Sequence, residues 1–415
     1  MPDVGFGNSV LVLGGSIRQL PLIQELKKRG FRITLVDYTP SPVAKPLVDI
    51  HYTASTFDPI ATLEVARKEK VDFLATMATD QPVHTAAFVS EKLALPFPLT
   101  LTQATAATDK TEMKKVLHSH SIPTPRGICL RELDHSPMEC ELSLPWVVKP
   151  ADNQGQRGVS LIHQPIHLPQ AFEKAQSHSR TGKVMVEEFE PGIEHAISGL
   201  VVDGVAHVLL VTRREHVKDK GFFGISQSHF FSPENLLSPK RELFQEVAQQ
   251  IADAIQLRNT PLYIQAMHNE KGLRVIEFAC RIGGAFESHT IPSWTDFPVV
   301  EAYANQLQGL PVLAPQEHEP VFAASHYFFC HPGKIAKILP PVQDRPNETM
   351  DFFFPLKTLG TQVGLEYNSA AKVGIFGVHG STKEELERKQ QTAWNSIQIL
   401  DPQGKNLLII PNQGK

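Results

Sequence analysis

A lysine followed by a glycine-containing turn is the part of this sequence best suited to chemistry. Lys149 ends the apolar run Trp146–Val148, and Gly155, Gln156 and Gly158 follow a few residues later. A lysine carried inward by a buried strand needs an anion to neutralise it. Glycines let backbone N–H groups approach that anion closely, because they carry no Cβ atom. The pattern is typical of a phosphate-binding loop, although an ordinary two-glycine hairpin uses the same residues.

Three further segments stand in a fixed order around this loop. Asp109–Thr111 opens a predicted helix before it, and residues 184–194 and 275–284 contain predicted strand ends after it. In this order the four segments resemble the ATP-grasp superfamily, carboxylate–amine ligase type, over about residues 100–310. The resemblance implies the ATP-grasp fold, with ATP and Mg²⁺ as the cofactors.

The resemblance also implies which residues hold the nucleotide. These are Lys110, Lys149, Gly155, Gln156, Gly158, Glu187, Glu188, Phe189 and Glu194. In such proteins the two lysines contact the phosphates, backbone groups at the 187–189 strand end read the adenine edge, and Glu194 takes the ribose hydroxyls. Taken alone, a lysine at a helix start is usually a solvated charge. The glutamate at 188 is likewise typical of a solvated turn.

The last of these segments contains candidate residues for binding the metal and the transferred phosphoryl group. Mg²⁺ prefers carboxylate oxygens together with phosphates and waters, so one or two protein acids suffice. Glu277 matches the principal metal ligand of the superfamily, and Arg281 offers a planar fork for the γ-phosphoryl group or an acyl phosphate. The sequence departs from the usual pattern at Gln265, where a glutamate is common, and at Ala279, where an asparagine is common. We therefore expect Glu277 and Gln265 to hold the metal, less strongly than in relatives with both residues.

A few more side chains are candidates for the substrate pocket. Ser288 and His289 follow the Gly283-Gly284 pair and are expected near the acceptor. Arg213 and Lys218 belong to a basic cluster, which is either a solvated face or a contact for substrate carboxylate or phosphate.

The periodicity predicts several domains of mixed α/β and α+β architecture. Residues 10–37 read as a βαβ unit of a parallel sheet. Its Gly14-Gly15-Ser16 turn and Asp37 suggest a dinucleotide site, but the full G-x-G-x-x-G fingerprint is absent. We expect an N-terminal parallel α/β domain over 1–98, two ATP-grasp subdomains over 99–180 and 181–312, and a small C-terminal α+β domain over 313–415. A capping box at Ser381–Glu384 opens the last predicted helix.

Composition limits the partners. The chain has 415 residues, 41% hydrophobic and 20% charged, with a net charge of −4. This mild acidity gives no basic footprint for nucleic acid, and no apolar run is long enough to span a membrane. The four cysteines form no C-x-x-C pair, and no signal-peptide pattern opens the sequence, so we expect a cytoplasmic protein.

The favoured hypothesis is an ATP-dependent ligase that joins a small carboxylate to an amine through an acyl phosphate. The runner-up is a formyl-phosphate-forming or carboxyphosphate-forming enzyme of the purine-pathway type. A nucleotide-binding protein without ligase activity is a third alternative, because of Gln265 and Ala279. The resemblance leaves a homodimer as an open alternative and does not name the acid or the amine.

Overall fold

The N-terminal unit is a parallel sheet covered by helices. The computed structural model describes residues 8–133, 142–218, 223–236, 240–316, 321–340, 342, 348–364 and 368–410. The first sheet has the order β3-β2-β1-β4, all parallel. Its elements are β1 (Ser9–Leu13), α1 (Leu20–Lys28), β2 (Arg32–Asp37), η1 (Lys45–Leu47), β3 (Ile50–Thr53), α2 (Pro59–Glu69), β4 (Phe73–Ala75) and α3 (Gln81–Leu93). The predicted parallel α/β layer at the start of the chain is confirmed.

The glycine turn after β1 does not have the geometry of a dinucleotide site. The Asp37 carboxylate accepts hydrogen bonds from the backbone N–H groups of Gly15, at 2.7 Å, and Thr39, also at 2.7 Å. Asp37 is buried. Its oxygens are therefore engaged in closing this turn, which disfavours the ribose-binding alternative.

The second unit is a small antiparallel sheet that carries the glycine loop. Two helices lead into it, and one helix packs on it. The elements are α4 (Leu101–Thr108), α5 (Lys110–Ser119), β5 (Gly127–Leu130), β6 (Trp146–Pro150), β7 (Ser160–Ile162), η2 (Pro165–His167), α7 (Leu168–Ser177) and β8 (Val184–Glu188), and the sheet order is β5-β8-β6-β7. The helix predicted to open at Asp109–Thr111 is α5, and Asp109 caps it by accepting from the N–H groups of Thr111 and Glu112. Lys149 lies on β6, so the strand expected to deliver it is also confirmed.

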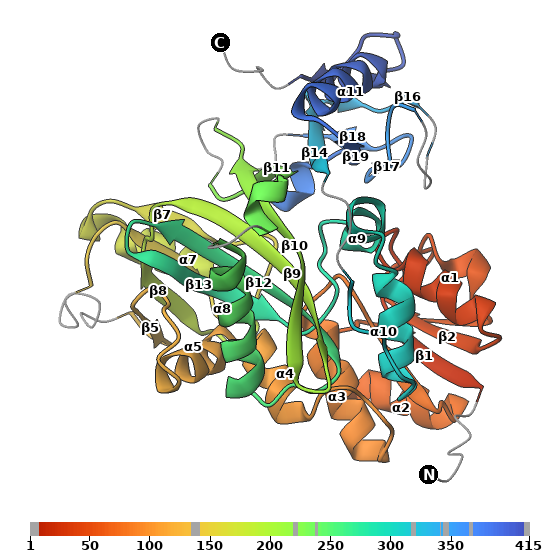
Figure 1. The fold of residues 1–415 in the computed structure, drawn as a ribbon, viewed down its shortest axis with the longest axis vertical. Coiled ribbons are helices and arrows are strands. Elements are labelled where there is room, and N and C mark those ends of the chain that lie inside the picture. The colour runs from red at the N-terminus through yellow and green to blue at the C-terminus, as the bar shows by residue number, and fades with distance from the viewer. Residues whose placement is uncertain are drawn as a thin grey trace.

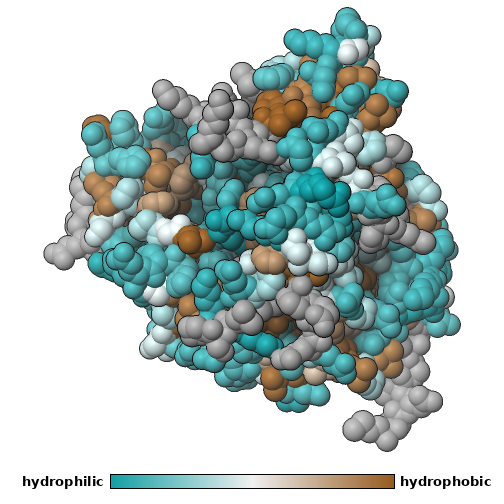
Figure 2. All heavy atoms as spheres, turned by 45° about the horizontal axis from the view of Figure 1, so that its top comes forward, coloured by the Kyte–Doolittle hydropathy of each residue, from teal (hydrophilic) through white to brown (hydrophobic). Residues whose placement is uncertain are grey.

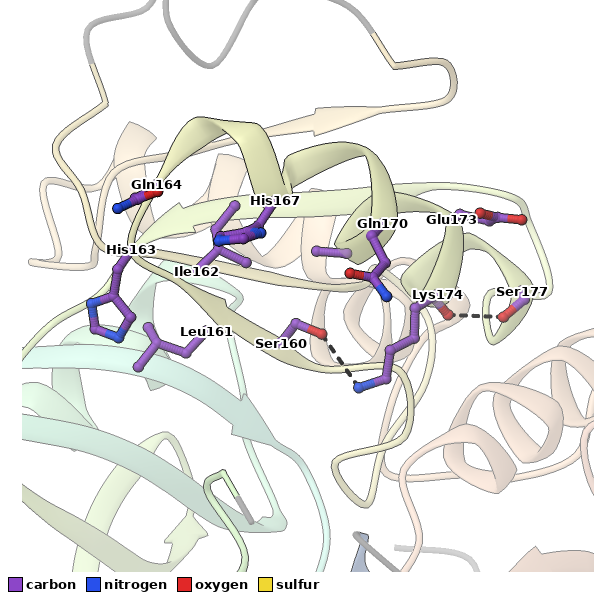
Figure 3. A pocket seen from close by; sticks show the side chains of 11 residues that line it. Ser160, Leu161, Ile162, His163, Gln164, His167, Gln170, Glu173, Lys174 and Ser177 are labelled. Atoms are coloured by element: carbon purple, nitrogen blue, oxygen red, sulfur yellow. Dashed lines mark hydrogen bonds between the residues drawn. The ribbon is translucent and has the colours of Figure 1, made fainter. Parts of the chain in front are cut away.

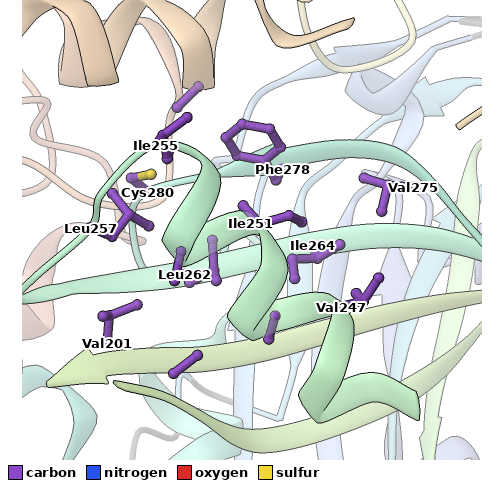
Figure 4. Packing of buried hydrophobic residues seen from close by; sticks show 14 of the residues in the cluster. Val201, Val247, Ile251, Ile255, Leu257, Leu262, Ile264, Val275, Phe278 and Cys280 are labelled. Carbon is purple, nitrogen blue, oxygen red and sulfur yellow. The ribbon is translucent and has the colours of Figure 1, made fainter. Parts of the chain in front are cut away.

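The third unit is a long, mostly antiparallel sheet. Its strands are β9 (Ile193–Val202), β10 (Val205–His216), β11 (Ser226–Phe231), β12 (Thr260–Asn269), β13 (Gly272–Ala279), β14 (Phe322–Cys330), β17 (Phe352–Pro355), β19 (Gly374–Gly380) and β21 (Leu408–Ile409). The order is β13-β12-β9-β10-β11-β14-β19-β17, with β21 paired to β14. Helix α8 (Lys240–Ala254) lays Val247 and Ile251 on this sheet, against Leu262 and Ile264 (Figure 4). This apolar contact holds the strands that carry the predicted metal ligands.

The remaining helices join the three units. They are η3 (Pro233–Leu236), α9 (Glu287–Thr295), α10 (Val299–Leu307), η4 (Ser369–Ala371) and α11 (Lys383–Ser396), and the short strands are β15 (Gly333–Lys334), β16 (Lys337–Leu339), β18 (Gln362–Val363) and β20 (Gln398–Leu400). Figure 1 shows α9 and α10 beside the red N-terminal unit, and the blue C-terminal part next to β11 and β14. Because β11 pairs with β14, the C-terminal strands continue the large sheet. The division into four domains remains a prediction.

The surface is mainly polar. Figure 2 shows hydrophilic residues over most of one face, with hydrophobic residues in smaller, separate groups. Among the helices in the described ranges, none combines the length and apolar character needed to cross a bilayer.

A partly buried ion pair, His379 with Asp351, leads to a prediction about pH. His379 Nδ1 lies 2.7 Å from Asp351 Oδ1, and Trp294 Nε1 donates to Asp351 Oδ2 at 2.9 Å. The hydrogen bond with Asp351 raises the pKa of His379 above 6.5, against the opposing effect of burial. The pair is therefore fully stabilising below the unfolded pKa and is lost as pH rises through the higher folded pKa.

We expect His379→Gln to lower the free energy of unfolding more at pH 6 than at pH 9. Urea unfolding of both proteins at the two pH values measures this difference. The exposed His167 supplies a control, His167→Gln, which should be neutral at both. A larger loss for His379→Gln at pH 9 would contradict the assignment.

Candidate active site

Most of the predicted site residues line one hollow between the small sheet and the large one. This hollow encloses about 150 Å³. Ten predicted residues line it: Lys110, Lys149, Gly155, Gln156, Glu187, Glu188, Phe189, Glu194, Gln265 and Glu277. Gly158 is not among them, and Arg281 lines an adjoining space together with Lys110 and Glu277. Segments far apart in the sequence therefore meet at one cleft.

A buried carboxylate between two lysines forms the floor of this cleft. Lys149 Nζ donates to Glu187 Oε2 at 2.6 Å, and Lys114 Nζ lies 3.3 Å from Glu187 Oε1. Burial alone would raise the pKa of Glu187, but the charges of Lys114 and Lys149 outweigh it and lower that pKa. Burial lowers the pKa of Lys114 to about 8. The anion that neutralises Lys149 here is thus a protein side chain.

Sequence reasoning did not single out Lys114. It lies one helical turn after Lys110 on α5, so the two lysines share a face of the helix. The four-residue spacing of the two lysines is the sequence signal from which Lys114 could have been predicted. Its ammonium also donates to Thr124 Oγ1 at 2.5 Å, which fixes its position beside Glu187.

The glycine loop closes over the cleft and touches two other units. Gly155 and Gly158 have φ values of 72° and 74°, a region that favours glycine. A Cβ on Gly158 would lie 2.9 Å from His178 and 3.0 Å from Pro150, so this glycine serves close packing. Backbone N–H groups from outside the loop bond to it: that of Asp80 donates to Gln154 Oε1 at 3.1 Å, and that of Ser369 to Gly155 O at 3.4 Å.

The strand end at 187–189 is held by its own backbone bonds. The N–H of Glu188 donates to Arg126 O at 2.9 Å, and the N–H of Phe189 donates to Pro145 O at 2.8 Å. In this conformation neither N–H group is open to an adenine. The Phe189 ring lies 6.3 Å from the ring of Phe223 across the cleft, and both residues line it. These two rings supply apolar surface suited to a flat base.

Glu194 is buried and ion-paired. It contacts Arg214 Nη1 through Oε1, and its Oε2 lies 2.7 Å from His216 Nε2. Burial would raise its pKa, but Arg214 and His216 lower it. Arg213, which the sequence suggested as a substrate contact, is exposed and lies 3.0 Å from Glu215. Successive residues of a strand point to opposite faces, so Arg214 is the one that reaches the site.

The predicted metal ligands lie side by side on β12 and β13. Gln265 and Glu277 are register partners, and Glu277 Oε2 lies 3.7 Å from Lys110 Nζ. Within the described ranges, no group of three His, Cys, Asp or Glu side chains is arranged to hold a metal. One exposed carboxylate beside a phosphate-binding cleft still fits Mg²⁺, which takes few protein ligands.

Arg281 is held by an acid from the N-terminal unit. Its Nη2 and Nε lie 2.6 Å and 2.7 Å from Asp80 Oδ1, and its guanidinium stands 5.2 Å from the Tyr263 ring centroid. The fork expected to face a phosphoryl group is therefore partly occupied by Asp80. Sequence reasoning missed Asp80, because nothing near it in the chain marks it as a partner of Arg281.

A second hollow, of about 820 Å³, lies over α7 and β7. It is larger, but its lining is mostly exposed. Lys174, one of its charged residues, donates to Ser160 Oγ at 3.3 Å (Figure 3). None of the predicted site residues contributes to it, so we place the chemistry in the smaller cleft.

Comparison with known families agrees with this geometry. The sequence model of the ATP-grasp domain matches residues 142–289, which span the glycine loop, the paired glutamates and Arg281. This stretch, about a third of the chain, therefore matches an ATP-grasp domain. Solved structures that share its fold extend the likeness beyond this domain. The L-amino acid ligase from Bacillus licheniformis covers 96% of this chain and 100% of its own, with a TM-score of 0.79 and 19% identity.

Curated relatives match this chain over shorter stretches. A D-alanine–D-alanine ligase of Ralstonia nicotianae is 36% identical over 89 residues, which are 21% of this chain and 26% of the relative. A formate-dependent phosphoribosylglycinamide formyltransferase of Actinobacillus pleuropneumoniae is 24% identical over 251 residues, 59% of this chain and 62% of the relative. The chain thus matches about a quarter to three fifths of these relatives' lengths.

Lys149 leads to a direct prediction for the ATP-grasp cleft. Lys149→Ala should weaken ATP binding about 10- to 100-fold, because it removes a charge-assisted contact worth roughly 1.5–3 kcal/mol. Calorimetric titration of the folded variant with ATP measures this. Lys174→Ala, which removes an exposed lysine of the same unit, should bind ATP normally. Equal affinities for Lys149→Ala and the unmodified protein would mean that Lys149 serves only to neutralise Glu187.

Proposed function

We propose that this protein is an ATP-dependent carboxylate–amine ligase acting on small metabolites or amino acids. The main observation behind the proposal is the convergence of two lysines, a carboxylate and an arginine from separate segments on one cleft and the space that adjoins it. These are the groups that position ATP and stabilise charge on a transferring phosphoryl group. The chemistry requires no side-chain nucleophile.

The reaction has two steps that the residues of the cleft can support. A substrate carboxylate oxygen attacks the γ-phosphorus, ADP leaves, and an acyl phosphate results. The amine then attacks the acyl carbon, phosphate leaves, and the amine loses a proton. Lys110 and Lys149 would neutralise the phosphates, and Arg281 would stabilise the charge on the transferred group. Arg281 would do so through those guanidinium N–H groups that are not bonded to Asp80.

Glu277, with Gln265 beside it, would hold Mg²⁺. The ion, when bound, supplies positive charge to the phosphates and orients them. The pair Lys110 and Glu277, 3.7 Å apart, would place one cation and one metal ligand at the same end of the nucleotide. Glu194 would take the ribose, with Arg214 and His216 fixing its orientation.

Two alternatives have support of their own. The likeness to the formate-dependent formyltransferase favours a formyl-phosphate or carboxyphosphate chemistry on the same cleft. Gln265 and Ala279 favour a nucleotide-binding protein without ligase activity. The three hypotheses share the ATP site and differ in what accepts the phosphoryl group.

One assay separates them. ADP release is followed with MgATP over pairs of amino acids and small carboxylates, with formate and bicarbonate as separate arms, and the products are identified by mass spectrometry. An amide product supports the ligase. ADP release that depends on formate or bicarbonate supports the purine-type chemistry. ATP binding without ADP release in every arm supports a nucleotide-binding protein without ligase activity.

We expect the protein to work on small molecules in the cytoplasm, without nucleic acid or membrane.

A further inference from the structure

A second group of cations lies around Tyr327, outside the nucleotide cleft. Tyr327 is a buried residue of β14. Lys372 Nζ stands 3.5 Å from the centroid of its ring, and Arg18 hydrogen-bonds to its side chain. Arg18 also donates through Nε to Gly284 O at 3.0 Å and lies 5.4 Å from the Phe286 ring. These cations come from the N-terminal unit and from the segment before β19.

The charges of this group are not balanced. Lys372 is only 9% exposed. Across the part of the chain that the structure describes, neither Lys372 nor Arg18 forms an ion pair with a carboxylate. Burial lowers the pKa of Lys372 well below its usual value, and the charges of Arg214 and Arg18 lower it further. A buried cation without an anion is costly, so its presence calls for a ligand.

The acid that acts on Tyr327 is already engaged in other hydrogen bonds. Glu287, which acts on Tyr327 electrostatically, accepts from the N–H of Gly283 at 2.8 Å. Ser198 is a second hydrogen-bond partner of the same carboxylate. Burial raises the pKa of Glu287, which reduces the negative charge that it could offer. It therefore does not replace an anion at Lys372.

The position of the group connects it to the reaction. Ser369, just before Lys372, donates its N–H to the carbonyl of Gly155 in the glycine loop. Gly284, which holds Arg18, follows Arg281 closely in the chain. An anion bound at Tyr327 would thus belong to a molecule that reaches the phosphoryl-transfer site.

The surroundings hold these side chains in place. Phe286 packs on Phe354, with ring centroids 5.0 Å apart, and both belong to one apolar cluster with Tyr327. This packing keeps Arg18 and Lys372 in position before any ligand arrives, which lowers the entropic cost of binding.

We propose that Arg18, Lys372 and the Tyr327 hydroxyl bind an anionic group of the substrate, a carboxylate or a phosphate distinct from the phosphates of the nucleotide. As a substrate site this rests on the ligase activity proposed above, and it restricts the substrate to acids that carry a further negative charge.

Thermal unfolding with succinate or inorganic phosphate as the probe tests the proposal. MgADP is kept saturating, and sodium chloride of equal ionic strength serves as the salt control. We expect the unmodified protein to be stabilised by one of the two anions. Lys372→Met should unfold at a higher temperature than the unmodified protein without anion, because it removes an unbalanced buried charge. The variant should also bind that anion at least about tenfold more weakly by calorimetry.

The outcomes are distinct. A response to succinate alone assigns a carboxylate, and a response to phosphate alone assigns a phosphate ester. Lys337→Met, at an exposed lysine, should behave like the unmodified protein. Arg18→Met should show the same loss of anion binding. If Lys372→Met does not fold, Arg18→Met is used for the test instead.

The inference is overturned if neither anion stabilises the unmodified protein, or if Lys372→Met responds as the unmodified protein does. It is also overturned if Lys372→Met unfolds at a lower temperature than the unmodified protein without anion, since Lys372 would then be stabilising without a ligand. Anion binding is measured without turnover, so the two proposals can fail separately. If the protein is an active ligase but no anion stabilises it, only this inference is overturned. If an anion stabilises it but no substrate pair gives ADP release, only the proposed function is overturned.

Discussion

Glu277→Gln is expected to lower ATP turnover by roughly 100- to 1000-fold, the scale seen when a group that stabilises transition-state charge is removed. The change keeps the shape of the side chain and removes the negative charge that would hold Mg²⁺. The Glu277 side chain is 35% exposed, so the fold should tolerate the change. Binding of ADP without magnesium should be retained, which separates metal binding from nucleotide binding.

Glu270→Gln is the matched control, because Glu270 is an exposed acid in the turn between β12 and β13. It should turn over ATP like the unmodified protein. The measurement is the rate of ADP release with the substrate pair found in the screen, at several magnesium concentrations. Turnover at the normal rate in Glu277→Gln would remove the basis of the metal assignment and of the mechanism.

Glu187→Gln should have the largest effect on stability. The substitution leaves Lys114 and Lys149, both buried, without their shared carboxylate. Removing one partner of a buried ion pair costs about 3–5 kcal/mol of unfolding free energy. Urea unfolding measures the loss. Glu188→Gln is the control, since Glu188 pairs at 3.5 Å with an Arg126 side chain that is 58% exposed. That surface pair should contribute about 1 kcal/mol or less.

A double variant makes this test sharper. Adding Lys114→Met to Glu187→Gln removes one of the two unbalanced cations, so part of the lost stability should return. Failure of the second substitution to restore any stability would show that charge imbalance is not the cause.

The sequence predicted what depends on neighbours in the chain. The cap at Asp109, the strand that carries Lys149 and the glycine loop are local patterns, and the structure has all three. The parallel sheet of the N-terminal unit follows from its βαβ periodicity. The motif order also indicated that these segments meet, because the superfamily resemblance carries that information.

The missed features depend on contacts between distant segments. Lys114 matters because Glu187 lies across the sheet from α5, and Asp80 matters because it reaches Arg281 from another unit. The choice between Arg213 and Arg214 requires the register of β10, which a basic cluster in a sequence does not reveal. The pairing of β11 with β14 joins strands that α8 to α10 separate in the chain, and no local pattern reveals such a pairing.

That pairing also decides which part of the molecule can move when the cleft opens. The large sheet continues through β14 into β19 and β17, so the strands that carry the predicted metal ligands and the C-terminal strands are hydrogen-bonded into one sheet. The small sheet β5-β8-β6-β7 is hydrogen-bonded as a separate sheet. Release of product should therefore involve rotation of the small sheet alone, about the short connection between β8 and β9. Rotation would have to break the contacts of the glycine loop with Asp80 and Ser369 and also those of the small sheet with α5, including the ion pair of Lys114 with Glu187, while the Tyr327 cations stay in place.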